Sequence, residues 1–354
     1  KKVEEIFFNI LDFKAGKFVS KKPLIDSYFD LKNRLDGHRF DNIASGLQNW
    51  TSEITLKWIE HWVKKTGKSV LCFSGGLSMN IKTNGEILKS KKIKFLSVPA
   101  SGGDESLSAG ACFAISKEKN RNVKHMESPY LGYSVSYDRK KSFLKIDKRK
   151  SSSKDFGIIK NFDNKYIAKL LQLDHIVARC VGRGEFGARA LGNRSILANP
   201  SNIKNIKKIN ESVKNRDFWM PFTPSILEEY SKDYLNNPKS VTSPYMTIGF
   251  DSNEKNRDKI IACLHPGDFS ARPQMVRKDL NYNYWHLINE FYKLTKIPCL
   301  LNTSLNLHGD PMNFSIEDAV RTLSKSSLEF LIIPNNKIIY KKKSKDFIKS
   351  LVNT

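Results

Sequence analysis

The stretch from residue 69 to residue 100 constrains the fold more than any other. It reads "SVLCFSGG", a short apolar run closed by two glycines, then "MNIKTNGEILKS" and "KIKFLSVPA". That order predicts a strand, a glycine turn, a helix and a second, parallel strand, which together make a βαβ unit. A second glycine-rich loop follows at residues 101–104 and opens another helix. Both loops are therefore expected at one rim of a parallel sheet, where ligands usually bind.

A long helix is predicted just before this unit. Between residues 41 and 66 apolar side chains recur every three or four residues, which places them on one face of a helix. Gly67 follows directly and is suited to end it. The residues of this face are Ile43, Leu47, Trp50, Ile54, Trp58 and Trp62.

The second half of the chain is predicted to be a separate, mixed α/β domain. Residues 116–160 lose the apolar period and are rich in Lys, Ser, Asp and Tyr, which is typical of a domain boundary. A capping box from Ser315 to Asp318 opens one of the later helices. We expect helices at 166–173, 202–215, 283–296 and 315–325, strands at 175–182, 243–250, 260–265 and 299–306, and a hairpin at 328–343.

The chain is strongly basic, because 60 Lys and Arg outnumber 36 Asp and Glu and leave a formal charge of +24. Such an excess favours anionic partners: phosphates, nucleotides, nucleic acid or an acidic membrane face. The lysines alone are also typical of a solvated surface. The arginines are more informative, since four of only 14 alternate with glycines in residues 177–197.

This arginine–glycine segment predicts a phosphate-binding loop. Guanidinium groups bind phosphate or carboxylate through paired hydrogen bonds, and glycines let the backbone wrap around the anion. The segment contains Arg179, Arg183, Arg189 and Arg194, with Arg183 among the candidate substrate ligands, and Lys214 and Arg216 extend the cluster. The alternatives are a basic RNA-facing patch and internal ion pairs with Glu185, Glu211 and Asp217.

The two glycine loops of the first half allow two interpretations each. Gly75 and Gly76 leave backbone amides accessible to a phosphate at the start of a helix, or they make a tight turn without a ligand. Asp104 could bind a hard metal ion or a ribose, or simply cap the helix that begins near Glu105. Spacing by itself favours the capping role.

The cysteines and the apolar runs indicate a cytoplasmic protein. Five cysteines are scattered, without a CxxC pair, in apolar surroundings, which predicts buried free thiols in a reducing compartment. No apolar run approaches the ~18 residues of a membrane span. The first residue is lysine, so we do not expect it to be the native start.

Several motifs resemble one known family in the same order along the chain. "GRGEFGARALGNRSIL", "VKNRDFWMPFTPSILEE", "FSARPQMV" and "PCLLNTSLNLHGDP" resemble the C-terminal domain of the O-carbamoyltransferase family, which includes nodulation protein U and the cephamycin and tobramycin carbamoyltransferases. "LCFSGGLSMNIKTNGEIL", "VPASGGDESLSAGA" and "SPYLG" resemble the part before it. The resemblance extends from about residue 41 to residue 335.

The resemblance implies a fold and an activity. It implies the second lobe of an actin-like ATPase domain over residues 1–128, a linker over 129–160 and a YrdC-like mixed α/β domain over 161–345. The YrdC-like half is expected to form carbamoyl-adenylate from carbamoyl phosphate and ATP with Mg²⁺. The actin-like half is expected to pass the carbamoyl group to a hydroxyl of a small molecule or sugar, with a divalent ion, iron being the one expected.

The resemblance also implies roles for particular residues. Lys214 and Arg216 match a K-x-R pair, and Ser304 and Asn306 match an S-x-N pair that, with Asn302 nearby, frames the site. The family arginines that hold the anionic substrate are matched by Arg189 and Arg272. Arg189, Lys214 and Arg272 are thus the expected catalytic residues, Gly75, Gly76 and Asn80 the nucleotide loop, and Asp104 the metal ligand.

Three departures from the family pattern leave alternatives open. No two of the seven histidines have the H-x-x-x-H spacing that supplies metal ligands. Met220 stands where an arginine is usual, and His308 where a longer base is common. We expect a fragment whose first lobe is missing. The alternatives are a first lobe on a partner polypeptide and a degenerate paralogue. The alternative functions are a tRNA threonylcarbamoylation-type protein and a partner-dependent binding subunit; nucleic acid is not the expected partner.

Overall fold

The computed structural model describes residues 2–123, 126, 128–143, 145–146, 152–215, 217 and 219–344. It divides into two compact units. The first comprises residues 1–104 together with 238–241 and 247–249, and the second comprises the remainder of the chain.

The long helix α3 (Phe40–Thr66) organises the first unit, as the apolar spacing predicts. Gly67 ends it at φ 69°, and its N–H donates to the Val63 carbonyl. The apolar face is only partly covered, because Ile54 is buried whereas Trp58 and Trp62 are about 40% exposed. The elements before it are α1 (Lys2–Ile10), the antiparallel pair β1 (Asp12–Lys14) and β2 (Lys17–Val19), and α2 (Ser27–Leu35).

The predicted βαβ unit is confirmed. β3 (Val70–Cys72) and β4 (Phe95–Ser97) pair in parallel, and α4 (Ile81–Lys89) connects them. Asn84 fixes α4 to a later part of the chain, since its Nδ2 donates to the Thr247 carbonyl at 2.7 Å. The first unit therefore includes residues 238–241 and 247–249, which come after residues 105–237 of the second unit in the sequence.

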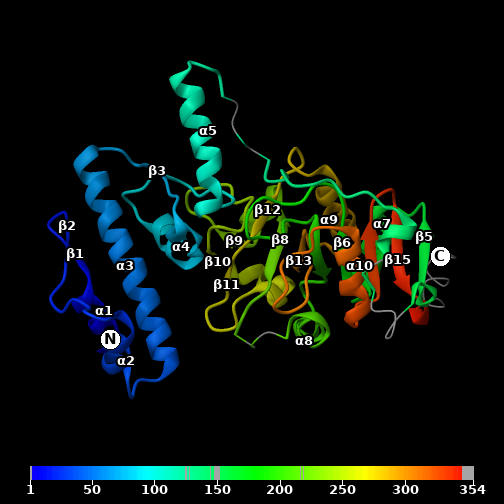
Figure 1. Cartoon of the computed structure of the whole chain (residues 1–354), viewed down its shortest axis with the longest axis horizontal. Coiled ribbons are helices and arrows are strands. Elements are labelled where there is room, and N and C mark those ends of the chain that lie inside the picture. The colour runs from blue at the N-terminus through cyan, green and yellow to red at the C-terminus, as the bar shows by residue number, and fades with distance from the viewer. Residues whose placement is uncertain are drawn as a thin grey trace. The chain divides into compact units, whose positions relative to one another are not determined.

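An eight-stranded mixed sheet forms the second unit, and its strands cross that unit in the order β12-β8-β13-β7-β6-β14-β15-β5 (Figure 1). The pairs β12–β8 and β14–β6 are parallel, and the other neighbours are antiparallel. A smaller antiparallel sheet contains β9 (Leu235–Asn236), β10 (Phe250–Ser252) and β11 (Ser270–Ala271). The large sheet comprises β5 (Phe156–Lys160), β6 (Val177–Cys180), β7 (Arg194–Ala198), β8 (Thr223–Leu227), β12 (Gln274–Val276), β13 (Cys299–Ser304), β14 (Phe330–Ile333) and β15 (Lys337–Lys341).

Helices cover both faces of this sheet, which confirms the mixed α/β class. On one face α7 (Asn164–Gln172) and α9 (Tyr282–Thr295) pack on each other and on β6, β8 and β13. On the other, α10 (Ile316–Lys325) packs on β6 and β14, and its predicted capping box is present. The remaining helices are α5 (Leu107–Glu118), α6 (Arg139–Ser142) and α8 (Lys204–Ile209). No helix in the described part of the chain combines the length and apolar character of a membrane span.

Two predicted strands are wrong, and part of the expected linker is a strand. Residues 243–249 form turns, with β10 beginning only at Phe250. Residues 260–263 end the 3-10 helix Glu254–Cys263, which buries Ile260, Ala262 and Cys263. Short apolar runs are compatible with either a strand or a buried helical turn, so the sequence pattern could not separate them. Residues 156–160, expected within the linker, form the edge strand β5.

The prediction that the five cysteines are buried is wrong for two of them. Cys180, Cys263 and Cys299 are buried free thiols, as expected, whereas Cys72 on β3 and Cys112 on α5 are exposed. Both exposed thiols belong to elements that the chain leaves largely uncovered, since no residue of α5 is buried. An apolar stretch indicates a regular element but does not say whether another element covers it.

Candidate functional site

Four of the predicted residues line one small pocket in the second unit. The pocket has a volume of about 90 Å³. Arg189 enters it from the loop between β6 and β7, Arg272 from the turn between β11 and β12, and Asn302 and Ser304 from β13. The full lining is Ala188, Arg189, Ala190, Pro221, Phe222, Thr223, Met246, Arg272, Asn302, Thr303 and Ser304.

Lys214 lies next to Ser304, one of the residues that line the pocket. It ends the π-helical turn Asn210–Lys214, after which Asn215 takes a left-handed conformation at φ 41°. The ammonium is almost fully buried, and it donates to Ser304 Oγ at 3.0 Å and to Asn306 Oδ1 at 2.6 Å. The lysine and the S-x-N pair are therefore brought together, as the family pattern implies. Arg216, the other member of the K-x-R pair, lies outside the described residues.

Asn302 presents a buried acceptor at this pocket. Its Nδ2 donates to the Ala190 carbonyl at 3.1 Å and to Ser225 Oγ at 2.9 Å, which fixes the orientation of the amide. Its Oδ1 is buried, and no hydrogen bond reaches it from any described residue. A buried amide oxygen without a donor costs free energy, on the order of 1–3 kcal/mol, unless a ligand or water supplies one. The pocket thus combines two guanidinium groups with an acceptor for an N–H group.

The arginine–glycine loop is held together mainly by its own polar groups. Glu185, which is buried, accepts N–H bonds through Oε1 from Leu191 at 2.8 Å, Asn193 at 2.8 Å and Arg194 at 3.1 Å. Arg194 donates to the Val181 carbonyl at 2.7 Å. The alternative of internal ion pairs is not observed for Glu185 or Glu211 with an arginine in the described residues. Glu211 lies 3.6 Å from a lysine, Lys207.

Two further arginines of the loop also bind protein groups. Arg183, predicted to bind substrate, donates to the Gly132 carbonyl at 3.0 Å and to the Leu131 carbonyl at 2.7 Å, and it does not line the pocket. Arg179 is buried and donates to Asn193 Oδ1 at 2.9 Å. Burial lowers the pKa of Arg179 to about 10, so its guanidinium stays charged at neutral pH. Of the four arginines, only Arg189 reaches the pocket.

The glycine loops of the first unit meet as expected. The Gly75 N–H donates to the Gly102 carbonyl at 2.8 Å, and both loops follow the carboxyl ends of the parallel strands. Gly75 has φ 101°, and a Cβ on Gly75 or Gly76 would meet no atom within 4 Å. Asn80, expected to contact a nucleotide, caps α4 by accepting from the Thr83 N–H at 3.1 Å. These glycines thus border open space, while the Asn80 side chain has a structural role.

The residues that the structure describes do not fit a metal centre. Asp104 is exposed at the start of a short 3-10 turn, Asp104–Ser106. No group of three or more His, Cys, Asp or Glu within the described ranges is arranged to hold a metal ion. A single carboxylate supplies little of the selectivity that histidine nitrogens give to transition-metal sites.

Thr223 also lines the pocket, although no pattern in the sequence predicts it as a site residue. Thr223 is the β8 register partner of Asn302, and its Oγ1 donates to the Asn302 carbonyl at 2.8 Å. Nothing in the local sequence signals this pairing, because it depends on which strands are neighbours.

Met220 is 44% exposed and outside the pocket lining. His308 donates from Nδ1 to the Lys214 carbonyl at 2.7 Å, next to the cluster.

The fold and the pocket define a mixed α/β protein with an arginine-lined pocket beside a buried lysine. Family models named carbamoyltransferase N-terminus and carbamoyltransferase C-terminus match residues 6–128 and 168–341. The chain belongs to the carbamoyltransferase family. The resemblance carried by its sequence motifs is thereby confirmed.

Curated relatives match most of the chain and are longer than it. An uncharacterised protein of Methanocaldococcus jannaschii is 32% identical over 93% of the chain and 61% of its own length. Nodulation protein NolNO of Sinorhizobium fredii is 31% identical over 82% of the chain and 43% of its own length. Nodulation protein NolO of Bradyrhizobium diazoefficiens is 31% identical over 82% of the chain and 53% of its own length. The chain spans about half the length of these relatives.

Proposed function

We propose that this chain carries the carbamoyl-activating half of an O-carbamoyltransferase. In this reaction carbamoyl phosphate, ATP and one water give carbamoyl-adenylate, phosphate and pyrophosphate. The adenylate then transfers its carbamoyl group to a hydroxyl of a small molecule or sugar and releases AMP. Membership of the family and the arginine-lined pocket support the proposal.

The observation that carries the proposal is the chemical match between the pocket and carbamoyl phosphate. Arg189 and Arg272 can bind the phosphate, and the buried Asn302 Oδ1 can accept a hydrogen bond from the carbamoyl NH₂ group. The volume of about 90 Å³ suits a small anion and is well below the roughly 300 Å³ at which pockets for larger ligands begin. ATP would therefore place at most its phosphates in this pocket, and Mg²⁺ would accompany them as part of the substrate.

The positive charges in and beside the pocket would offset the repulsion between the two anionic substrates of this reaction. Carbamoyl phosphate and ATP are both polyanions, and their reacting groups meet only if the repulsion between them is offset. Lys214 adds a buried positive charge 3.0 Å behind Ser304, and the two arginines add two more at the pocket wall. These groups would hold the anions and stabilise charge that builds up during transfer. We assign the YrdC-like domain to this unit and the second actin-like lobe to the first.

Arg189→Ala is expected to weaken binding of carbamoyl phosphate by on the order of 1.5–3 kcal/mol, the range for charge-assisted contacts. Isothermal titration calorimetry of the full chain measures this. Arg183→Ala is the matched control, because Arg183 lies in the same loop but donates to backbone carbonyls outside the pocket. Equal affinity of wild type and Arg189→Ala would refute the assignment of this pocket.

The chain alone is expected to activate carbamoyl phosphate without transferring the carbamoyl group to an alcohol. Its described residues supply the cationic pocket but no group of three or more metal ligands, and we therefore expect transfer to require a polypeptide bearing the H-x-x-x-H lobe. The measurement is exchange of label between pyrophosphate and ATP beside a carbamoyl-transfer assay. Asp104→Ala should leave the exchange rate unchanged, since Asp104 belongs to the other unit. Loss of exchange in this variant would contradict the division of labour.

A further inference from the structure

A second, larger cavity lies at the opposite end of the eight-stranded sheet. Its volume is about 610 Å³, and it is formed by the edge pair β5–β15 and by the segment that contains α6. Three strands, β7, β6 and β14, separate β15 from β13 of the first pocket. The cavity belongs entirely to the second unit and shares no residue with the arginine-lined pocket. A volume of this size is typical of sites for nucleotide-sized ligands.

Two like charges face each other across the strands beneath this cavity. Lys160 on β5 and Lys337 on β15 are direct register partners in the antiparallel pair. Like charges in such positions repel and destabilise the pairing. Lys337 Nζ lies 5.0 Å from the centre of the Tyr137 ring, a favourable contact that does not neutralise the ammonium charge. An anion bound between them would remove the repulsion.

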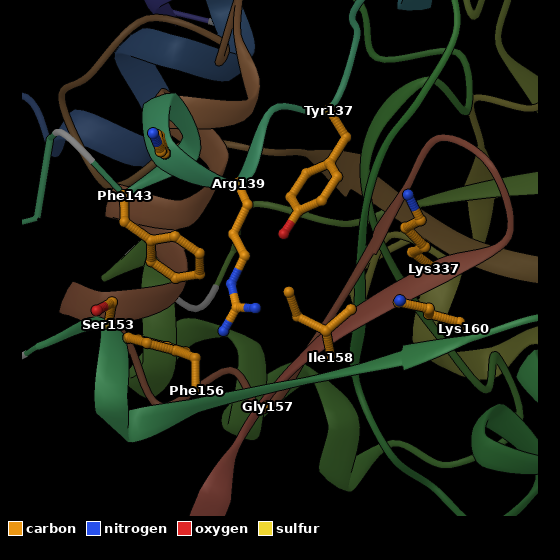
Figure 2. A pocket seen from close by; sticks show the side chains of 10 residues that line it. Tyr137, Arg139, Phe143, Ser153, Phe156, Gly157, Ile158, Lys160 and Lys337 are labelled. Atoms are coloured by element: carbon orange, nitrogen blue, oxygen red, sulfur yellow. The ribbon is translucent and has the colours of Figure 1, made fainter.

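Arg139 brings a third cation from the other side. Figure 2 shows its guanidinium and the Tyr137 hydroxyl directed into the space above Ile158, with the Lys160 and Lys337 amino groups on the opposite side. No described carboxylate forms an ion pair with any of these three cations, and none lines the cavity. The nearby Asp138 is exposed and caps α6 by accepting from the Lys140 and Lys141 N–H groups.

The cavity also has an apolar wall and an unsatisfied hydroxyl. Phe143, Phe156 and Ile158 line one side, and the two phenylalanine rings lie 5.8 Å apart. The Tyr137 Oη is buried without a hydrogen-bond partner among the described residues. A ligand suited to these groups carries both an anionic end, to meet the cations and the hydroxyl, and a flat apolar end, to pack on the rings.

We propose that this cavity, between Arg139 and the Lys160–Lys337 pair, is a binding site for a nucleoside phosphate, separate from the site of carbamoyl activation. The phosphates lie between the three cations and accept a hydrogen bond from Tyr137, and the base packs on the apolar wall. The proposal does not rest on the assignment of the arginine-lined pocket, because the two sites have no residue in common.

Equilibrium dialysis of the full chain with radiolabelled ADP at physiological salt tests the proposal. Wild type is expected to show saturable binding that the Lys160→Gln/Lys337→Gln variant loses by on the order of tenfold in affinity. Lys165→Gln/Lys342→Gln removes the same charge from exposed positions outside the cavity and is expected to bind as wild type does. Pyrophosphate is expected to compete with ADP, whereas adenosine without a phosphate is expected to bind weakly.

A second measurement separates binding from folding. The Lys160→Gln/Lys337→Gln variant should unfold at a temperature no lower than wild type, because the substitutions relieve repulsion, and ADP should raise this temperature less than it does in wild type. Unchanged ADP affinity in the variant, or no competition by pyrophosphate, overturns the proposal. Binding of single-stranded RNA but not of ADP also overturns it and makes the cavity an RNA contact. ADP binding lost in Arg189→Ala but not in the lysine variant assigns the nucleotide to the first pocket alone, which likewise overturns it.

Discussion

Lys214→Met is expected to lower the rate of carbamoyl phosphate-dependent exchange between pyrophosphate and ATP by on the order of a hundredfold to a thousandfold. The substitution keeps the length of the side chain but removes a buried positive charge next to the proposed reacting groups, and the loss of one preorganised electrostatic group has effects of this size. The Ser304–Asn306 hydrogen bond, at 2.6 Å, does not depend on the lysine for its partners. The pocket is therefore expected to keep its shape.

The stability of this variant provides the control for folding. Methionine leaves the Asn306 carbonyl without the Lys214 donor, so thermal unfolding of Lys214→Met is expected at a somewhat lower temperature than in wild type, and exchange is compared below that temperature, where the variant is folded. Lys204→Met, an exposed substitution at the start of α8, should leave both exchange and unfolding unchanged. Exchange at the wild-type rate in a folded Lys214→Met protein would show that the lysine has a structural role only.

Gly192→Ala is expected to destabilise the second unit by on the order of 3 kcal/mol. Gly192 has φ 111°, a conformation that costs an L-residue about 1–3 kcal/mol, and an added Cβ would lie 2.4 Å from a carbon of the buried Tyr284 ring. Either the loop or α9 would have to shift, and Arg179 would lose its alignment with the Gly192 carbonyl. Chemical denaturation followed by fluorescence measures the change.

A second glycine supplies the matched comparison for this substitution. Gly110 lies in α5, and a Cβ there would meet no atom within 4 Å. Gly110→Ala should therefore be neutral or stabilising by up to about 1 kcal/mol, because alanine is the better helix former. If Gly192→Ala proved as stable as Gly110→Ala, the close approach of the loop to α9 would not hold in solution.

Local patterns predicted much of the secondary structure. Apolar spacing placed α3, and the sequence of apolar run, glycine pair and helix placed the parallel pair β3–β4. The capping box from Ser315 to Asp318 placed the start of α10. These elements could be predicted from the sequence because the residues that signal each element lie within one helical turn or one strand of it. Residues 260–265 were predicted wrongly, since a short apolar run has no period by which a strand and a helical turn can be told apart.

The sequence alone determined which residue types are available for chemistry, and their motifs identified the family. Only the tertiary structure decided how the arginines are used: Arg179, Arg183 and Arg194 donate to other groups of the protein, while Arg189 reaches the pocket. All four arginines lie in the same glycine-rich segment of the sequence. Their roles differ because strand pairing brings β8 and β13 beside one part of the loop, whereas the rest of the loop lies against residues 131–133 and α9. Such long-range pairing cannot be predicted from the local sequence.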